Sequence, residues 1–265
     1  ARGEQLLGAD QDNGIIISDE VQPEHLGWYA ELAELVCDGL NECGYVYCPG
    51  GIMAKTEQWR QSLEIWQETV RRWATSPTPD AVMRVSIFFD IRCIYGASSL
   101  CDALQKTMLK QASKNSIFLA ALAANALDTK PPLGIFRRFV VDRDGEHRDS
   151  LDLKKRGVLP VTEIVRLHAL AHKIPAVNTN ERLKALAENK HMTIVDSRNL
   201  VDALHFIQHQ RIKHQCGQIV RGEQVTNFLN PRDLPKMAKE QLRDAFTIID
   251  DAQSAVRQTY RAGMG

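Results

Sequence analysis

The sequence lacks several features that would assign it to a specialised class of protein. No stretch approaches the roughly 18 consecutive apolar residues of a membrane span. The six cysteines include no Cys-x-x-Cys pair, and their spacings of 6, 5, 45, 8 and 115 residues match no zinc module. We therefore expect no association with a membrane, no structural metal, reduced thiols and a cytoplasmic location.

The chain also lacks an initiator methionine and a signal peptide, since it begins Ala-Arg-Gly-Glu-Gln. This start predicts a cut within a larger protein. The 265 residues are 44% hydrophobic and 25% charged, which are globular values and exclude a disordered or fibrous chain. This length predicts one large domain or two ordinary ones.

The charges balance to a net of zero, which argues against a nucleic-acid-binding protein, but they are unevenly distributed. Residues 1–113 carry 9 Lys and Arg against 16 Asp and Glu, a balance of −7, and residues 114–265 carry 24 against 17, a balance of +7. The split favours two domains of opposite charge that share an anionic ligand. Ordinary surface variation is the alternative.

Residues 1–113 predict a mixed α/β unit with a small sheet. Short apolar runs predict strands at 14–17 and 45–47, and the β-rich run 82–89 predicts a third. Apolar positions at helical spacing predict a helix over 26–42 and a second helix whose core-facing side runs from Trp59 to Trp73.

Residues 114–265 predict a mainly helical domain, which gives the whole chain an α+β fold class. A helical pattern over 100–127 breaks near Lys114-Asn115, and Asp144-Gly145 indicates a hairpin between 136–141 and 147–153. Beyond about residue 155 we expect an almost wholly helical chain without extended strands in 162–260. The expected helices are 162–172, 179–190, 197–215 and 235–260, with Thr179 and Ser197 as N-caps.

Asp10-Gln11-Asp12 is the clearest chemical feature of the sequence. In an extended segment, residues i and i+2 point to the same face, so both carboxylates can reach one small volume. Two carboxylates so close repel each other unless a cation lies between them, and hard oxygen ligands suit Mg²⁺. A turn or a solvated edge is the alternative. Asp90 ends the predicted strand 82–89, so we expect it to bring a third carboxylate to the pair.

These residues resemble a known family of enzymes. Arg2-Gly3-Glu4 followed by Asp10-Gln11-Asp12 is similar to the nucleotidyltransferase signature Gly-Ser, Arg-Gly-Glu, Asp-x-Asp. That signature occurs in the bacterial nitrogen-regulatory protein uridylyltransferase and its relatives in the DNA-polymerase-beta-like superfamily. Further segments, spread over the whole chain, resemble nucleotidyltransferases often found behind cyclic-nucleotide-binding and CBS domains: Cys48-Pro49-Gly50-Gly51-Ile52-Met53-Ala54, Phe89-Asp90-Ile91-Arg92, Pro131-Pro132-Leu133-Gly134, Leu151-Asp152-Leu153-Lys154, Asn178-Thr179 with Arg182-Leu183, and Arg211-Ile212-Lys213-His214-Gln215.

The resemblance implies a magnesium- or manganese-dependent enzyme that moves a nucleoside monophosphate from an NTP to an acceptor and releases pyrophosphate. Asp10, Asp12 and Asp90 are then the catalytic and metal-binding residues, with 1–113 as the catalytic domain and 114–265 as the substrate-binding domain. Two ions held by these carboxylates would activate the nucleophile and stabilise the leaving oxygen, and Asp90 could accept the proton of the nucleophile.

The same resemblance predicts which residues contact the nucleotide. We expect Arg2 to approach the triphosphate, with Gly50, Gly51 and Lys154 contributing to the nucleotide site. The Gly-Ser pair of the signature is not in the sequence before Ala1, so we expect an incomplete phosphate cradle in this chain. For Arg2 the alternative is a terminal charge without function, and for Lys154 a solvated turn.

The resemblance predicts some of the binding partners and leaves the acceptor open. An NTP is implied, as are regulatory domains upstream in the full-length protein, whereas a protein tyrosine, a small molecule and an RNA end all stay open as acceptors. The rival hypothesis is a catalytically silent module that senses nucleotides within a larger signalling protein. Three acidic residues favour the enzyme, because a sensor would not need all of them.

Overall fold

The computed structural model describes residues 1–142 and 144–260. The chain divides into two compact units, Ala1–Gln111 and Ala112–Gly265, and the boundary lies within one long helix, α4 (Ser98–Lys114). The expected α+β class is confirmed, because a small parallel sheet in the first unit is followed by a mostly helical second unit. Among the described residues, no helix is both long enough and apolar enough to cross a bilayer.

The sheet of the first unit consists of two short parallel strands, β1 (Ile15–Ile17) and β2 (Arg60–Ser62). Their register pairs Ile15 with Arg60 and Ile17 with Ser62. Immediately before β1, Gln11 forms a parallel bridge with Tyr47, and its backbone N–H donates to the carbonyl of Val46 at 3.0 Å. The strand predicted at 45–47 is therefore reduced to a single bridge, which nevertheless places that segment beside Asp10-Gln11-Asp12.

The helices of the first unit begin either at a capping side chain or without one. In α2 (Leu63–Thr75) the N-cap Ser62 accepts from the Ile65 N–H, and the predicted helix over 26–42 is confirmed as α1 (Leu26–Glu42). Two short 3₁₀ turns, η1 (Pro23–His25) and η2 (Glu57–Trp59), precede α1 and β2.

The strand predicted at 82–89 is wrong, because these residues belong to a helix, α3 (Pro79–Phe88). Thr78 caps this helix by accepting from the Ala81 N–H at 3.2 Å, and Pro79 occupies its first turn, where a missing N–H costs nothing. Three of its four buried residues, Val82, Val85 and Phe88, recur every three positions on one face, and the fourth is Ala81. The β-branched composition indicated a strand, but burial at helical spacing decided the structure.

Three of the four tryptophans lie in the core of the first unit, as the sequence predicts for them. Trp59, Trp66 and Trp73 surround Phe88, with ring centroids 4.6, 5.1 and 5.6 Å from the phenylalanine ring. All four side chains are buried. Trp59 precedes β2 rather than lying on α2, so this cluster joins the sheet to α2 and α3 and holds β1 in place.

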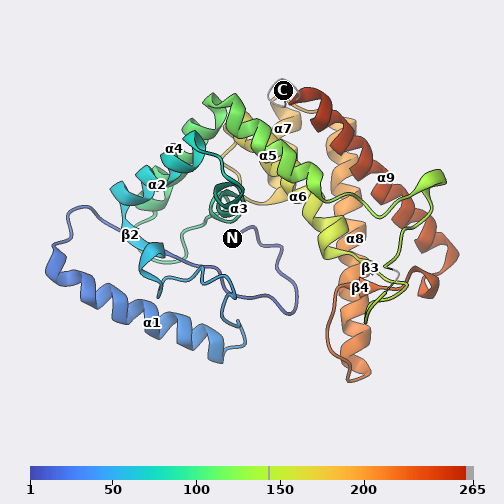
Figure 1. Ribbon diagram of the computed structural model, residues 1–265, viewed down its shortest axis with the longest axis horizontal. Helices are drawn as coiled ribbons and strands as arrows, with labels where there is room; N and C mark the ends of the chain where they lie inside the picture. The colour runs from blue at the N-terminus through green and yellow to red at the C-terminus, as the bar shows by residue number, and fades with distance from the viewer. Residues whose placement is uncertain (143, 261–265) are drawn as a thin grey trace. The chain divides into compact units, whose positions relative to one another are not determined.

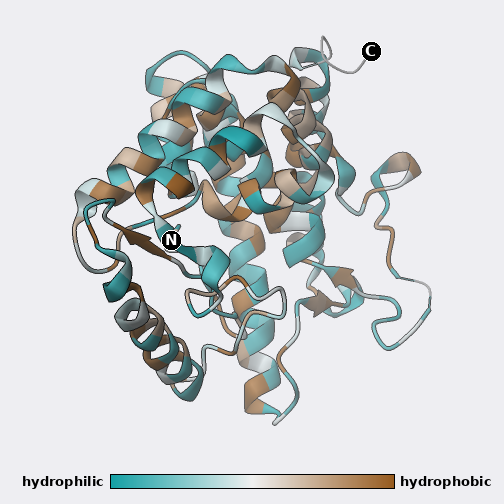
Figure 2. Ribbon diagram, turned by 60° about the vertical axis from the view of Figure 1, so that its left-hand side comes forward, coloured by the Kyte–Doolittle hydropathy of each residue, from teal (hydrophilic) through white to brown (hydrophobic). Residues whose placement is uncertain are grey.

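The described residues of the second unit form five helices besides the end of α4, and hydrophobic and hydrophilic residues alternate along them (Figure 2). Helix α8 runs beside α9, and α6 packs against α5, α7 and α9 (Figure 1). The core between them includes Leu183, Leu204, Leu242 and Phe246, which are all fully buried. The helices are α5 (Ser116–Asp128), α6 (Leu159–Ala171), α7 (Thr179–Glu188), α8 (Ile194–Val220) and α9 (Lys236–Thr259).

The helix caps of this unit differ in part from the predicted ones. The break at Lys114-Asn115 is confirmed, since the Asn115 side chain accepts from the Phe118 N–H and begins α5. Helix α7 is capped by Asn178 rather than Thr179, and α8 by Thr193 rather than Ser197. Ser197 instead lies within α8, where its hydroxyl donates to the Leu183 carbonyl at 3.0 Å.

The expectation of no extended strand within 162–260 is wrong at one place. β4 (Phe228–Leu229) pairs antiparallel with β3 (Leu151–Asp152). The segment before β4 is held against α8, because Arg211 Nε donates to Asn227 Oδ1 at 2.6 Å and Gln215 Nε2 donates to the same oxygen at 3.3 Å. Polar side chains of α8 thus fix this extended segment. The strand is too short to show the alternation of apolar and polar residues by which a strand is predicted from sequence.

The predicted hairpin of 136–141 with 147–153 is wrong in the described residues, because the two segments pair with other parts of the chain. Residues 151–152 take β4 as their partner, and Phe139 bridges to Leu133. The loop between them is closed by the Asp142 N–H, which donates to the Ser150 carbonyl at 3.1 Å. Arg143, in the predicted turn, lies outside the described residues. Three short helical turns complete this unit: η3 (Ile135–Arg137), η4 (Lys154–Val158) and η5 (Pro231–Asp233).

Candidate functional site

The candidate site is built on the extended segment that precedes β1, where inward and outward side chains alternate. Gln11 is 5% exposed, and its amide donates to the carbonyls of Cys37 at 2.9 Å and Tyr45 at 3.0 Å. Asn13 donates to Gln11 Oε1 at 3.0 Å and accepts from the Ala54 N–H at 2.8 Å. These bonds fix one face of the segment against the interior of the first unit.

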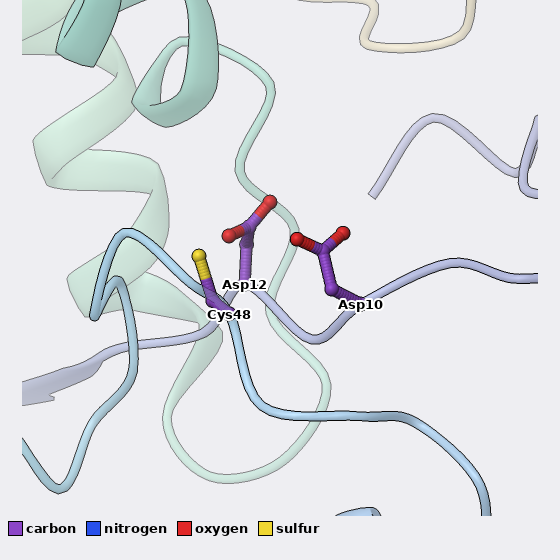
Figure 3. A group of neighbouring side chains, drawn as sticks. All are labelled: Asp10, Asp12 and Cys48. Atoms are coloured by element: carbon purple, nitrogen blue, oxygen red, sulfur yellow. The ribbon is translucent and has the colours of Figure 1, made fainter. Parts of the chain in front are cut away.

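Asp10 and Asp12 consequently occupy the opposite face, because side chains alternate along an extended chain. The sulfur of Cys48 joins them: in the parallel bridge of Gln11 with Tyr47, the next residues, Asp12 and Cys48, are neighbours on the same face. One ligand atom from each of the three residues lies within 4.8 Å of the others. Figure 3 shows the two carboxyl groups and the thiol directed to the same side of the two neighbouring segments.

Cys48 begins a tight loop that keeps its sulfur at this position. The Gly51 N–H donates to the Cys48 carbonyl at 2.9 Å, and Gly51 has a φ of +67°, a conformation that costs an L-residue about 1 kcal/mol or more. A Cβ on Gly50 would lie 3.6 Å from Cys48 Sγ, so any side chain there would touch the sulfur. Gly50 and Gly51 therefore place no side chain beside the cluster.

The surroundings of the Cys48 thiol act on its pKa in opposite directions. Burial raises the pKa, and the hydrogen bond with Asp12 adds to the rise, since a neighbouring carboxylate disfavours the thiolate. Backbone hydrogen bonds from Ile52 and Gly50 lower the pKa. The balance is a raised pKa, so the group is a thiol at neutral pH in the metal-free protein.

Asp90 lies at a second position, where a protein cation faces it. Its side chain is 5% exposed, and Arg2 Nη1 is 2.7 Å from its Oδ2. Arg2 also contacts Glu4, with Nε 3.0 Å from Oε2, so the guanidinium bridges two carboxylates. The amino group of Ala1 lies in the same surroundings: burial lowers its pKa first, followed by the positive charges of Arg92 and Arg2.

The comparisons with known proteins identify the family to which the chain belongs. The family described as "Putative nucleotidyltransferase substrate binding domain" matches residues 116–260, and "Putative nucleotidyltransferase DUF294" matches residues 1–80. The chain belongs to this nucleotidyltransferase family. No curated protein matches the chain in sequence.

The site residues expected from the sequence fall partly in one matched segment, partly in the other and partly between them. Asp10, Asp12 and Gly51 lie in the matched segment 1–80 of the nucleotidyltransferase family, and Lys154 lies in the segment 116–260. Asp90 falls between the two matched segments. Lys154 is exposed at the start of η4, directly after β3.

Sequence reasoning placed Asp90 at the end of a strand, and this placement is wrong. Asp90 follows helix α3, and its N–H donates to the Ile87 carbonyl at 3.4 Å. The close group of ligand atoms contains Asp10, Asp12 and Cys48 but not Asp90. A three-carboxylate metal site therefore stays a prediction.

Three residues of the site were not expected from the sequence. Cys48 was considered only as a thiol and as part of a family-like segment, and Gln11 and Asn13 were not singled out. For Gln11 and Asn13 the signal that could have found them is local: polar residues that alternate with Asp10 and Asp12 before an apolar strand have to face the interior. Such buried amides need fixed partners.

Proposed function

We propose that the protein transfers a nucleoside monophosphate from an NTP to an acceptor with release of pyrophosphate. The observation that supports this most is the pair Asp10 and Asp12, held on one face of an extended segment within the part of the chain that matches the nucleotidyltransferase family. The family relationship gives the class of reaction, and the paired carboxylates supply the chemistry that the class requires.

The residues of the cluster fit a divalent cation. Two carboxylates in close proximity repel each other, and a cation between them relieves the repulsion. Carboxylate oxygens are the ligands that Mg²⁺ and Mn²⁺ prefer. Asp10 and Asp12 would hold such an ion, which neutralises phosphate charge and makes the attacking oxygen more acidic when bound.

The other residues would act through position and charge. Asp90 could accept the proton of the attacking hydroxyl at its carboxylate, and Arg2, which faces Asp90, is the group best suited to bind phosphate oxygens through its fork of N–H donors. In transfer, Arg2 would exchange part of its contact with Asp90 for the triphosphate, which would also free the carboxylate to act as a base. The small residues Gly50 and Gly51 would let the nucleotide approach the backbone.

Nucleotide sensing without turnover is the second candidate function. The Arg2–Asp90 ion pair favours it, because a carboxylate neutralised by a guanidinium is a poorer base and a poorer metal ligand. A sensor would bind NTP through the same residues and keep Arg2 on Asp90.

The test incubates the protein with each labelled NTP, Mg²⁺ and a cell extract, and identifies the molecule that becomes labelled. We expect label transfer to fall at least about 100-fold in Asp12→Asn, because the variant loses one of two metal ligands. Asp102→Asn is the matched control, since Asp102 is an exposed carboxylate on α4 in the same unit, and should transfer label normally. NTP binding without label transfer for any of the NTPs would overturn the enzyme hypothesis and support the sensor.

A further inference from the structure

We propose that Cys48 is the third protein ligand of the Asp10–Asp12 site, so that the site binds a thiophilic divalent cation of the zinc class. The inference concerns the site of the proposed function and adds a residue and a class of metal to it. It accounts for a feature that two carboxylates alone leave unexplained, namely a thiol aimed at the same volume.

The backbone brings the sulfur to this place. The Gln11–Tyr47 bridge sets Asp12 and Cys48 side by side on two parallel segments, and the amides of Gln11 and Asn13 anchor those segments from behind. One ligand atom from each of Asp10, Asp12 and Cys48 lies within 4.8 Å of the others (Figure 3). Ligand atoms around one tetrahedral zinc ion lie about 3.5 Å apart. Side-chain movements of about 1 Å would therefore bring the three ligand atoms to the distances that zinc requires.

The donor set distinguishes between metals. Mg²⁺ takes oxygen ligands and gains little from sulfur, whereas a thiolate selects Zn²⁺ and its chemical relatives such as Cd²⁺. Two carboxylates and one thiolate provide three ligands, which leaves a fourth tetrahedral position for water or a phosphate oxygen. On binding, the Cys48 thiol releases its proton to solvent and the sulfur forms the bond to the metal.

The loop also positions the sulfur. The backbone N–H groups of Ile52 and Gly50 contact Cys48 Sγ, and outer hydrogen bonds of this kind orient metal ligands. Gly51 is in the left-handed region, which lets the loop turn tightly enough to aim the N–H groups. A consequence follows for the enzyme: Zn²⁺ should compete with Mg²⁺ for Asp10 and Asp12 and inhibit the Mg²⁺-dependent reaction.

The first test titrates the protein with Cd²⁺ and follows the ultraviolet charge-transfer band of a thiolate–cadmium bond. We expect one band in the wild-type protein at stoichiometric metal, its loss in Cys48→Ser, and its retention in Cys43→Ser, an exposed cysteine of the same unit. In Asp12→Asn the band should persist with an affinity for Cd²⁺ lower by about 100-fold. An unchanged band and affinity in Cys48→Ser would overturn the proposal.

The second test needs no variant and so does not depend on the folding of one. Wild-type protein is alkylated with iodoacetamide with and without Zn²⁺, and the modified cysteines are identified by mass spectrometry. Zn²⁺ should slow alkylation of Cys48 at least about tenfold and leave Cys43 unaffected. Equal rates at Cys48 with and without Zn²⁺ would refute the assignment. Both readouts are independent of turnover: a cadmium band without label transfer contradicts only the proposed function, and label transfer without the band contradicts only Cys48 as a ligand.

Discussion

At the scale of single residues, Gly14 shows how closely the site is tied to the core. A Cβ at this position would lie 2.9 Å from the backbone carbonyl oxygen of Trp59 and 3.4 Å from the Trp66 ring. Neither a backbone carbonyl nor a buried tryptophan can move away easily. Gly14 therefore allows the segment that carries Asp10 and Asp12 to approach β2.

We expect Gly14→Ala to lower the free energy of unfolding of the first unit by about 1–3 kcal/mol, because the added methyl overpacks a fixed contact. Urea unfolding followed by tryptophan fluorescence would measure the change, since the tryptophans of the core lie beside this contact. Gly39→Ala is the matched control: Gly39 lies within α1 with no atom near its added Cβ. There alanine should leave the stability unchanged or raise it by up to about 1 kcal/mol. Equal stability of the two variants would contradict the close contact.

Part of the site could be predicted from single residues and part could not. The spacing of Asp10 and Asp12 predicted a shared face, and the buried amides of Gln11 and Asn13 show why the face is kept. Cys48 could not be placed, because its position depends on a pairing between segments 36 residues apart (47 − 11) that rests on one bridge. A bridge of that kind leaves no repeating pattern in the sequence.

At the scale of elements, the prediction succeeded where helices have a polar and an apolar face. Helix α1 begins and ends where its pattern predicted, whereas α3 was mistaken for a strand. In α3 the residues Val82, Val85 and Phe88 do repeat every three positions, but the apolar residues between them, Met83 and Ile87, hid that period. The capping pair Thr78-Pro79 was the better signal, because its chemistry is specific to a helix start.

Helix α6 carries a partly buried histidine that should make the second unit sensitive to acid. Burial, with a smaller contribution from the nearby His172, lowers the pKa of His168 to about 4. Its Nδ1 lies 3.4 Å from the hydroxyl of Tyr260, whose own pKa burial raises to about 12. His168 is therefore neutral in the folded protein at neutral pH.

The sign of the pH dependence follows from proton uptake. Because the folded pKa lies below the ordinary value of 6.5, the unfolded chain binds more protons between pH 6.5 and pH 4. The free energy of unfolding should thus fall as the pH decreases through this range, by about 3 kcal/mol at most from His168. His172, whose pKa is also lowered by burial and by His191, contributes in the same direction.

In His168→Gln the free energy of unfolding should change less steeply between pH 6.5 and pH 4 than in the wild-type protein. The measurement is urea unfolding at several pH values, followed by far-ultraviolet circular dichroism. His209→Gln, at an exposed position on α8, should keep the wild-type slope. A wild-type slope in His168→Gln would show that the histidine does not titrate on unfolding.

At the scale of the whole molecule, composition and pattern predicted the α+β class, and the resemblance predicted the family. The short strand β4 was missed, because two extended residues fixed by Arg211 and Asn227 leave no apolar period. The charge balance of −7 and +7 belongs to this scale as well, since no single element produces it. Its consequence for function is still a prediction.

That prediction is that Lys154, from the positively charged second half of the chain, stabilises the phosphates during transfer. Pyrophosphate gains charge as it leaves, and Asp10 and Asp12 repel phosphate wherever no metal intervenes. A lysine is a mobile point charge suited to phosphate, and Lys154 is exposed at the start of η4, within the segment that matches the substrate-binding family.

Lys154→Ala should lower kcat/KM for the NTP by about tenfold, equivalent to about 1.4 kcal/mol of transition-state stabilisation, with unchanged stability. Lys213→Ala removes an exposed lysine of the same unit on α8 and should have no effect on kcat/KM. If the two variants turned over NTP equally well, Lys154 would be a solvated charge, and the phosphates would have to be held by Arg2 and the metal alone.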